Sequence, residues 1–299
     1  MLKALRSFFD YLIFGNWFIS FGAVSLTLQT YLMLNKPMKI DALLCLIFFS
    51  TLFEYNLHRF LSLRKTSSSL QPNKFSWAKE HYNLFILTLA FSVIGFLASA
   101  LFIKFDIVLI LTPLGLIAIA YSFPLIKSKN SRIRLRELSA FKILFVAFVW
   151  GIATVIIPVL NDGLSIFSTD VLYMTLRRIL FVFAITIPFD IRDRDTDLEE
   201  GLKTIPIILG ERNSKLLAFF LLMLFSLLIF LQYNNRFGHQ CGQDDFSIPL
   251  YFSVMITTFL VFKSTESNGK YFHYFWVDGM MILQFVLIVI YNSFILHTN

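Results

Sequence analysis

Charged residues are scarce in this chain. Of its 299 residues, 15% are Asp, Glu, Lys or Arg, while 57% are hydrophobic. An average soluble domain is about 25% charged, because its surface faces water. The low charge excludes an ordinary soluble domain. We assign the net charge of +7 to membrane orientation and expect no nucleic-acid partner.

Cysteine is scarce as well, with Cys45 and Cys241 as the two examples. One lies in an apolar run and the other in a polar loop, so they provide no disulfide framework. A Gly-rich phosphate loop, a Ser-His-Asp arrangement and a Cys-His metal pattern are also missing from the sequence. These absences exclude several common classes of soluble enzyme.

Long apolar runs are abundant instead. Tyr11–Leu34 and Gly279–Leu296 carry no charged residue, and the first run is too long for a cleavable signal peptide. A bilayer core requires about 20 apolar residues per helix. The sequence predicts an all-α integral membrane protein, a bundle of about nine transmembrane helices that forms one polytopic domain over residues 1–299. The expected spans are residues 11–34, 41–60, 83–103, 107–126, 141–160, 171–189, 215–233, 248–263 and 274–296.

Positive charges are distributed unevenly around these spans. With the N-terminus in the cytoplasm, 20 of the 26 Lys and Arg residues fall in cytoplasmic segments. Cytoplasmic loops of membrane proteins carry such an excess. We therefore predict a cytoplasmic N-terminus and an external C-terminus, in a bacterial plasma membrane. Arg177 and Arg178 lie in the outer half of the sixth span, where we expect their side chains to reach the membrane surface.

The densest set of acids lies in segment 189–206, FDIRDRDTDLEEGLKTIP, where the sixth span meets the cytoplasm. If the helix continues at about 100° per residue, Asp190, Asp193 and Asp197 fall within roughly 60° of one another. Asp195 and Glu199 then point to the other side. Three carboxylates on one stripe repel one another unless a cation lies among them. Mg²⁺ suits them, because it takes oxygen ligands from carboxylates, water and substrate phosphates.

A solvated charged loop is the alternative interpretation of this segment, because arginines interleave with the acids and could pair with them locally. An EF-hand calcium loop is excluded. With Asp193, Asp195 and Asp197 aligned to its ligands, Leu198 stands where glycine is needed and Thr204 where the closing glutamate is needed.

The same segment resembles the second Asp-rich motif of the UbiA-type membrane prenyltransferases, in which Asp residues at this spacing precede Gly and then Lys. The matching residues are Asp190, Asp193, Asp197, Gly201 and Lys203, followed by Thr-Ile-Pro. The stretch Tyr121–Lys127 is similar to the family's Tyr, Pro and Lys stretch after the fourth span. The nine-span layout with cytoplasmic polar loops is also similar, so the resemblance extends over nearly the whole chain.

The resemblance implies transfer of a prenyl group from a polyprenyl diphosphate to an aromatic or similar hydrophobic acceptor within the membrane lipid. It implies that Asp190, Asp193 and Asp197 are catalytic and hold Mg²⁺, which neutralises the departing diphosphate. It further implies substrate contacts from cationic and aromatic residues that follow the fourth span or the Asp motif. These residues are Tyr121, Lys127, Arg134 and Lys203.

The family's first Asp-rich motif is missing. That motif begins Asn-Asp and has further acids three and then four residues on. When Asn56 is aligned with its Asn, Leu57, Phe60 and Arg64 stand at the three acid positions. The loss argues against a two-metal mechanism.

The residues that remain in this region suggest a different site. Glu54 and His58 lie one helical turn apart and either bind a metal together or form a membrane-edge pair, with Arg59 as a second partner for Glu54. We predict a single metal ion assisted by a guanidinium of Arg59 or Arg64. Asn56, His58, Arg59 and Arg64 are thus expected to bind substrate.

Two other functions are consistent with the sequence. Loss of the first motif allows a family member that no longer catalyses transfer and instead binds an isoprenoid lipid or a partner protein. Charges inside a span, namely Arg177 and Arg178, allow a transporter. The second Asp-rich motif favours Mg²⁺-dependent prenyl transfer over both.

The orientation can be tested with cysteine accessibility in intact cells. We expect cysteines placed at Lys65 and Lys129 to be protected from an impermeant label, and a cysteine at Gln243 to react, because charge asymmetry puts only Gln243 outside. Labelling of position 65 or 129 from outside would show that the orientation is wrong.

Overall fold

The computed structural model describes residues 2–63, 73–122, 126–127, 132–133, 141–199, 201–234 and 245–298. These residues form helices and their connections, together with one short antiparallel pair, β1 (Ile126–Lys127) with β2 (Arg132–Ile133). The predicted all-α membrane bundle is confirmed. The positions chosen for topology labelling, and Cys241, lie outside the described residues.

Each predicted span corresponds to a helix or to a run of consecutive helices. Among the described residues, five helical segments are long and apolar enough to cross a bilayer, or six if the bent pair α1–α2 is one span. Nine crossings stay a prediction. The elements are α1 (Leu2–Phe14), α2 (Trp17–Met33), α3 (Ala42–Leu63), α4 (Asn73–Glu80), α5 (Tyr82–Ala100), α6 (Phe105–Ser122), α7 (Phe141–Gly151), η2 (Ile152–Ile156), α8 (Ile157–Asn161), α9 (Thr169–Arg192), α10 (Arg194–Glu199), α11 (Ile205–Asn234), α12 (Ser247–Lys263), η3 (Phe272–Val277) and α13 (Gly279–Thr298).

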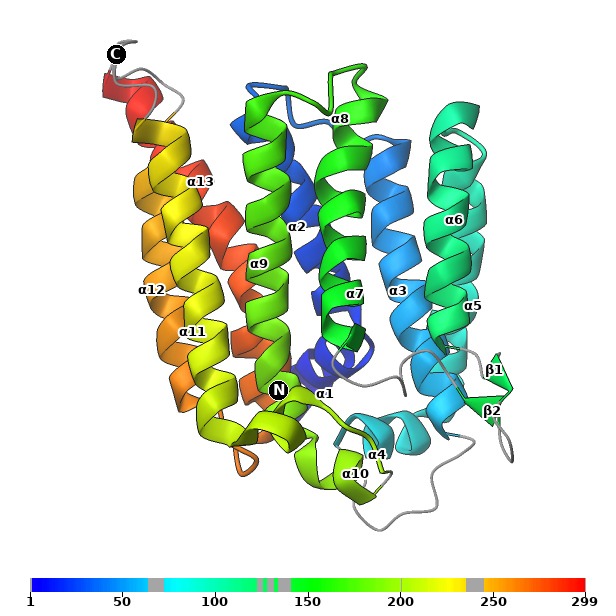
Figure 1. The fold of residues 1–299 in the computed structure, drawn as a ribbon. Helices are drawn as coiled ribbons and strands as arrows, with labels where there is room; N and C mark the ends of the chain where they lie inside the picture. The colour runs from blue at the N-terminus through cyan, green and yellow to red at the C-terminus, as the bar shows by residue number, and fades with distance from the viewer. Residues whose placement is uncertain are drawn as a thin grey trace.

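The long helices run side by side, and α1, α4 and α10 lie together at one end of the bundle (Figure 1). Helix α9 packs against α7 and α11, α12 packs against α11 and α13, and α13 returns to α2. Helix α3 packs against α2 on one side and α5 on the other. This arrangement brings α2, α3, α7, α9 and α13, which are far apart in the sequence, around a common centre.

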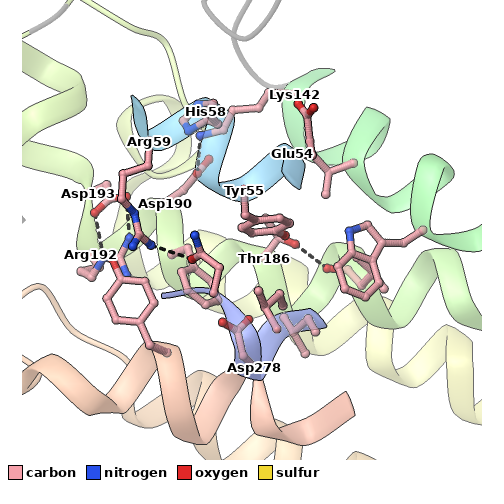
Figure 2. A pocket seen from close by; sticks show the side chains of 18 of the residues that line it. Glu54, Tyr55, His58, Arg59, Lys142, Thr186, Asp190, Arg192, Asp193 and Asp278 are labelled. Carbon is pink, nitrogen blue, oxygen red and sulfur yellow. Dashed lines mark hydrogen bonds and ion pairs between the residues drawn. The ribbon is translucent and has the colours of Figure 1, made fainter. Parts of the chain in front are cut away.

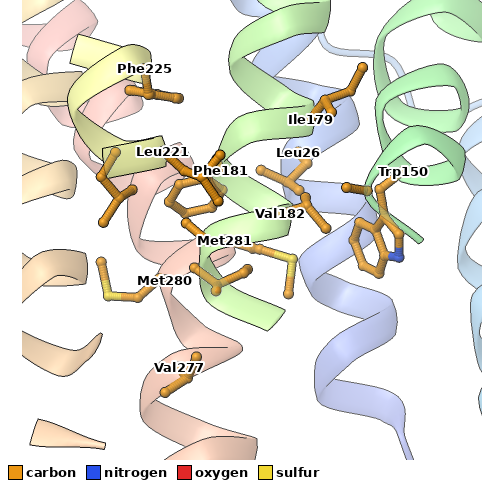
Figure 3. Close-up of a cluster of buried hydrophobic side chains, with 14 of the residues drawn as sticks. Leu26, Trp150, Ile179, Phe181, Val182, Leu221, Phe225, Val277, Met280 and Met281 are labelled. Carbon is orange, nitrogen blue, oxygen red and sulfur yellow. The ribbon is translucent and has the colours of Figure 1, made fainter. Parts of the chain in front are cut away.

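Apolar side chains from these helices fill the middle of the bundle, as Figure 3 shows for Leu26, Phe181, Phe225 and Met281. Helices in lipid gain little from the hydrophobic effect when they associate, so close packing and interhelical hydrogen bonds hold them together. A chain of buried amides provides such bonds.

That chain joins three helices. Gln29 of α2 donates to Gln284 of α13 at 3.1 Å, and Gln284 donates to Ser253 of α12 at 2.9 Å. Close packing is equally evident between α3 and α5, where a Cβ on Gly95 would collide with the ring of Phe49. A larger residue at position 95 would therefore push α5 away from α3.

The chain bends by 60° between α1 and α2, at Gly15 and Asn16. A side chain at Gly15 would collide with the Tyr11 carbonyl oxygen, and Asn16 takes the left-handed conformation, φ 66°, that Asn tolerates. Asn16 Nδ2 donates to Asn56 Oδ1 at 3.0 Å. Asn56 Nδ2 in turn donates to the carbonyl oxygens of Gly15 at 3.1 Å and Leu52 at 2.8 Å. Helix α3 therefore holds the bend through one buried amide.

Asp10, one turn before the end of α1, makes a second set of contacts that hold this helix. Lys270 Nζ donates to Asp10 Oδ1 at 3.1 Å, and the Tyr271 hydroxyl donates to the same oxygen at 2.6 Å. Partial burial opposes the charge on Lys270, but its hydrogen bonds to Tyr271 and Asp10 outweigh this and raise the pKa of Lys270 above its ordinary value. These contacts fasten α1 to the start of η3.

The prediction that Arg177 and Arg178 reach the membrane surface is wrong. Both are buried, at 3% and 4% exposure, because they lie on the face of α9 that meets other helices. Arg178 donates to the hydroxyls of Thr154 at 3.2 Å and Thr30 at 3.4 Å. Arg177 lies over the ring of Tyr233, 5.8 Å from its centre. Hydroxyl groups and an aromatic ring inside the bundle thus contact these two guanidiniums, in place of the lipid headgroups that were expected to do so.

The bend between α1 and α2 can be tested through Asn56. Replacement by Ala removes a buried side chain that makes three hydrogen bonds, so Asn56→Ala should lower the free energy of unfolding by about 1–3 kcal/mol. Thermal unfolding in detergent measures the loss. The control is Asn213→Ala, because the Asn213 amide bonds the Leu209 carbonyl at an exposed position. Equal melting temperatures for the two variants would contradict the role of Asn56.

Candidate functional site

A cavity of about 350 Å³ lies at the centre of the helices described above (Figure 2). Its wall includes residues of α2, α3, α7, α9, α10, η3 and α13. Polar side chains gather on α3 and around the end of α9, whereas the remainder of the wall is largely apolar. The apolar residues include Ile19, Val146, Val149, Trp150, Val182, Ile185 and Met281.

The acids of the predicted stripe share this cavity. Asp190, Asp193 and Asp197 all line it, whereas Asp195 is exposed and lies outside its wall. The three acids therefore border one cavity, but the predicted continuous helix is wrong, because α9 ends at Arg192 and α10 begins at Arg194. The Asp193 amide donates to the Phe189 carbonyl at 3.0 Å, and the Asp197 amide donates to the Asp193 carbonyl at 2.8 Å, so the helical hydrogen-bond pattern continues on both sides of this break.

The glycine of the motif has a conformational role. Gly201 has φ 71°, the left-handed region that glycine adopts without steric cost. This allows the amide of Leu202 to donate to the Asp197 carbonyl at 2.9 Å, which is the bond that closes a helix end in the Schellman motif. Gly201 thereby turns the chain directly after the last acid and leaves Leu202 on the cavity wall.

Two of the acids form ion pairs with side chains of the site. Lys142 of α7 donates to Asp190 at 3.1 Å. Arg192 donates to both oxygens of Asp193, from Nε and Nη2, each at 2.7 Å. The expected local pairing between arginines and acids is thus confirmed for Arg192.

The donor chemistry of this wall fits a hard cation such as Mg²⁺, since three carboxylates border one cavity. In the described part of the chain, no three His, Cys, Asp or Glu side chains lie close enough together to form a metal site. A bound ion would compete with Lys142 and Arg192 for Asp190 and Asp193.

Two guanidinium groups and a phenol also border the cavity. Arg59 is 5% exposed, and its Nη2 donates to Asn16 Oδ1 at 2.6 Å. Arg192 lies over the ring of Tyr274, 4.6 Å from its centre. Arg59 Nη1, Arg192 Nη1 and the Tyr274 hydroxyl are buried and lack a hydrogen-bond partner among the described residues. Donors of this kind are costly to bury unsatisfied, so they favour an oxygen-rich ligand.

The other predicted residues lie in different surroundings. His58 and Arg59 line the cavity, as does Glu54, but Arg59 bonds Asn16 rather than Glu54. Asn56 is buried behind Asn16, and Lys203 is exposed and away from the cavity wall. Outside the described residues or side chains lie Arg64, Tyr121, Lys127 and Arg134.

Sequence reasoning missed five residues of the site: Asn16, Lys142, Arg192, Tyr274 and Asp278. Asp278 carried a signal, since it is a charge at the start of an apolar run. Lys142 and Arg192 are cations at span ends, where the positive-inside rule already accounts for them. Asn16 and Tyr274 carried no signal, because uncharged polar residues are common in membrane spans.

The model of the UbiA prenyltransferase family matches residues 80–241, which is more than half of the chain. No curated protein sequence gives a significant match.

Solved structures share the fold. One, described as giving structural and mechanistic insights into the biosynthesis of digeranylgeranylglyceryl phosphate synthase in membranes, aligns with a TM-score of 0.54 and 16% identity, over 96% of this chain and 99% of that one. The apo structure of a UbiA homolog from Aeropyrum pernix K1 aligns with a TM-score of 0.54 and 16% identity, over 97% and 98%. This chain belongs to the UbiA prenyltransferase family.

Proposed function

We propose that this protein transfers a prenyl group from a polyprenyl diphosphate to a hydrophobic, aromatic or similar acceptor within the membrane. One observation carries the proposal: a single cavity combines the three carboxylates of the motif and other charged side chains with a largely apolar remainder. A prenyl diphosphate has the same two parts: its diphosphate head is multiply charged and its prenyl chain is long and apolar. We further propose that residues 1–299 act as one domain with a cytoplasmic N-terminus, in a bacterial plasma membrane.

The acids would receive the diphosphate through a metal ion. Asp190, Asp193 and Asp197 would hold Mg²⁺, which supplies positive charge to the departing diphosphate. Lys142 adds a cation next to Asp190, so it can donate to a phosphate oxygen if the metal takes the carboxylate. Leu202 and the turn at Gly201 close the same side of the cavity.

The guanidiniums would replace the family's first Asp-rich motif. In the family, the first motif would hold a second metal ion and so bring positive charge to the diphosphate. In this chain, the three acid positions of that motif contain Leu57, Phe60 and Arg64, which cannot hold a metal ion. Arg59, in the same stretch of α3, faces the cavity with one buried nitrogen that no described residue bonds. Arg192 presents a second such nitrogen from α9. Planar guanidiniums match phosphate oxygens in geometry and stay charged when buried.

The apolar wall suits the reactive part of the donor. Loss of diphosphate leaves an allylic cation, which water would quench. Val149, Val182 and Ile185 exclude water from their side of the cavity, and Trp150 offers an aromatic face, the type of surface that stabilises a cation. Aromatic stabilisation and exclusion of water therefore support transfer to an organic acceptor rather than hydrolysis.

A family member without catalytic activity is the second candidate. The ion pairs Lys142–Asp190 and Arg192–Asp193 favour it, because they neutralise two acids without a metal. Such a protein would bind an isoprenoid lipid or a partner protein. Mg²⁺-dependent binding of a prenyl diphosphate separates the two candidates, because only the enzyme requires the metal.

The first test compares three acids of the motif. Asp193 and Asp197 line the cavity and Asp195 does not, so Asp193→Asn and Asp197→Asn should weaken Mg²⁺-dependent binding of farnesyl diphosphate at least tenfold, while Asp195→Asn leaves it unchanged. Isothermal titration with and without Mg²⁺ gives the affinities. Equal effects from all three substitutions would show that the motif is only a charged surface.

The second test concerns the guanidiniums. Arg59→Ala should weaken farnesyl diphosphate binding at saturating Mg²⁺ by about 1.5–3 kcal/mol, the range for hydrogen bonds to charged groups. Arg59→Lys keeps the charge and should recover part of the affinity if the role is electrostatic. Arg212→Ala, at an exposed position, is the control. Arg64→Ala belongs to the same series, and unchanged affinity in both the Arg59→Ala and Arg64→Ala proteins would favour the inactive family member.

A further inference from the structure

Asp278 is a charged residue of the cavity that the proposed chemistry leaves unused. It lies between η3 and α13, where its amide donates to the carbonyl of His273, five residues earlier, at 3.1 Å. This wider turn brings Asp278 to the cavity wall, as Figure 2 shows. Tyr274 lines the same cavity. Turns of this π type inside helices are frequent at functional sites.

The Asp278 carboxylate makes no hydrogen bond or ion pair with any described residue. Arg192 is close enough to act on Asp278 electrostatically, but its guanidinium already donates to both oxygens of Asp193. An ionisable group that faces a cavity inside a membrane bundle is expensive to maintain, and such groups usually serve a substrate or ion. The cavity therefore presents a hydrogen-bond acceptor that no described side chain uses.

The surroundings of Asp278 restrict that partner. Met281, one turn along α13, and Ile19 of α2 are apolar residues of the same wall. The carboxyl oxygens of Asp278 accept hydrogen bonds, so this residue can bind a molecule that carries a donor group. Because the diphosphate is negatively charged, it should contact the cations Arg59, Lys142 and Arg192 and not the Asp278 carboxyl group.

We propose that Asp278 is the specificity-determining residue for the acceptor, and that it selects a neutral apolar molecule by accepting a hydrogen bond from the hydroxyl group of that molecule. This inference rests on the proposed function, because it places a second substrate next to the diphosphate. It assigns the acceptor to the class of hydrophobic phenols and alcohols, and it makes Asp278 a catalytic residue in direct contact with substrate.

The same contact accounts for the proton in the transfer step. The bond between C1 of the prenyl chain and the diphosphate oxygen breaks, and its electron pair leaves with the diphosphate. A lone pair of the acceptor oxygen forms the new bond to C1. The hydroxyl proton passes to the Asp278 carboxylate, so the products are a prenyl ether, diphosphate and a neutral Asp278.

Binding of two matched probes tests the inference. 4-Hexylphenol donates a hydrogen bond, whereas 4-hexylanisole has nearly the same shape and cannot. In detergent-solubilised full-length protein, calorimetry should show that the phenol binds roughly ten- to a hundredfold more tightly, the factor expected for a hydrogen bond to a charged group. Asp278→Leu should abolish this preference, and Asp278→Asn should retain part of it because the amide oxygen still accepts.

Two further measurements distinguish the possible failures. Asp195→Leu, an exposed acid away from the cavity wall, should keep the preference of the unmodified protein. All variants should bind farnesyl diphosphate with Mg²⁺ as the unmodified protein does. If Asp278→Leu retains the phenol preference, the inference is overturned while the proposed function stands.

A different result would give Asp278 a purely structural role. If Asp278→Leu loses farnesyl diphosphate binding together with the phenol preference, Asp278 is only a counter-ion that positions Arg192, and the inference is overturned. If the unmodified protein does not bind farnesyl diphosphate at all, the proposed function fails and the role in transfer fails with it.

Discussion

The ion pair between Arg192 and Asp193 joins a guanidinium and a carboxylate of the cavity wall, the two kinds of charged group on which the proposed site depends. Both Asp193 oxygens bind one guanidinium at the point where α9 ends, and that guanidinium rests on the ring of Tyr274 from η3. Charges in a membrane bundle are tolerated when they pair with each other or face a polar cavity. This pair therefore fixes both the end of α9 and its contact with the last span, and it leaves one buried Arg192 nitrogen without a hydrogen-bond partner among the described residues.

Much of the fold was predictable, because bilayer thickness fixes how long an apolar run must be. Each predicted span is a helix or a run of helices, and the spacing of Asp190, Asp193 and Asp197 placed them on one wall despite the break at Asp193. Helical periodicity operates over one or two turns, so a local break leaves the grouping intact.

The rest depended on contacts between distant segments. Arg178 was assigned to the membrane surface from its distance to the span end, but the direction of its side chain is set by Thr30 and Thr154, on other helices. The same holds for Asn56, whose resemblance to a substrate-binding residue gave no indication that it would bond Gly15 and Asn16. Sequence spacing describes neighbours on one helix and contains no information on what an adjacent helix presents.

The bend between α1 and α2 connects the cavity to the surface of the protein. Asn16 forms part of that bend and also accepts the hydrogen bond that orients Arg59, so the guanidinium cannot shift without a change at the bend. Leu5 and Phe8 lie on the exposed side of the helix that the bend directs, at 65% and 58% exposure. Thermodynamic linkage is reciprocal. If a ligand in the cavity moves Arg59 and thereby changes how tightly α1 binds a partner at Leu5 and Phe8, then binding of that partner changes the affinity of the cavity for its ligand by the same factor. Through Asn16, the N-terminal helix and the cavity are thus parts of one linked system.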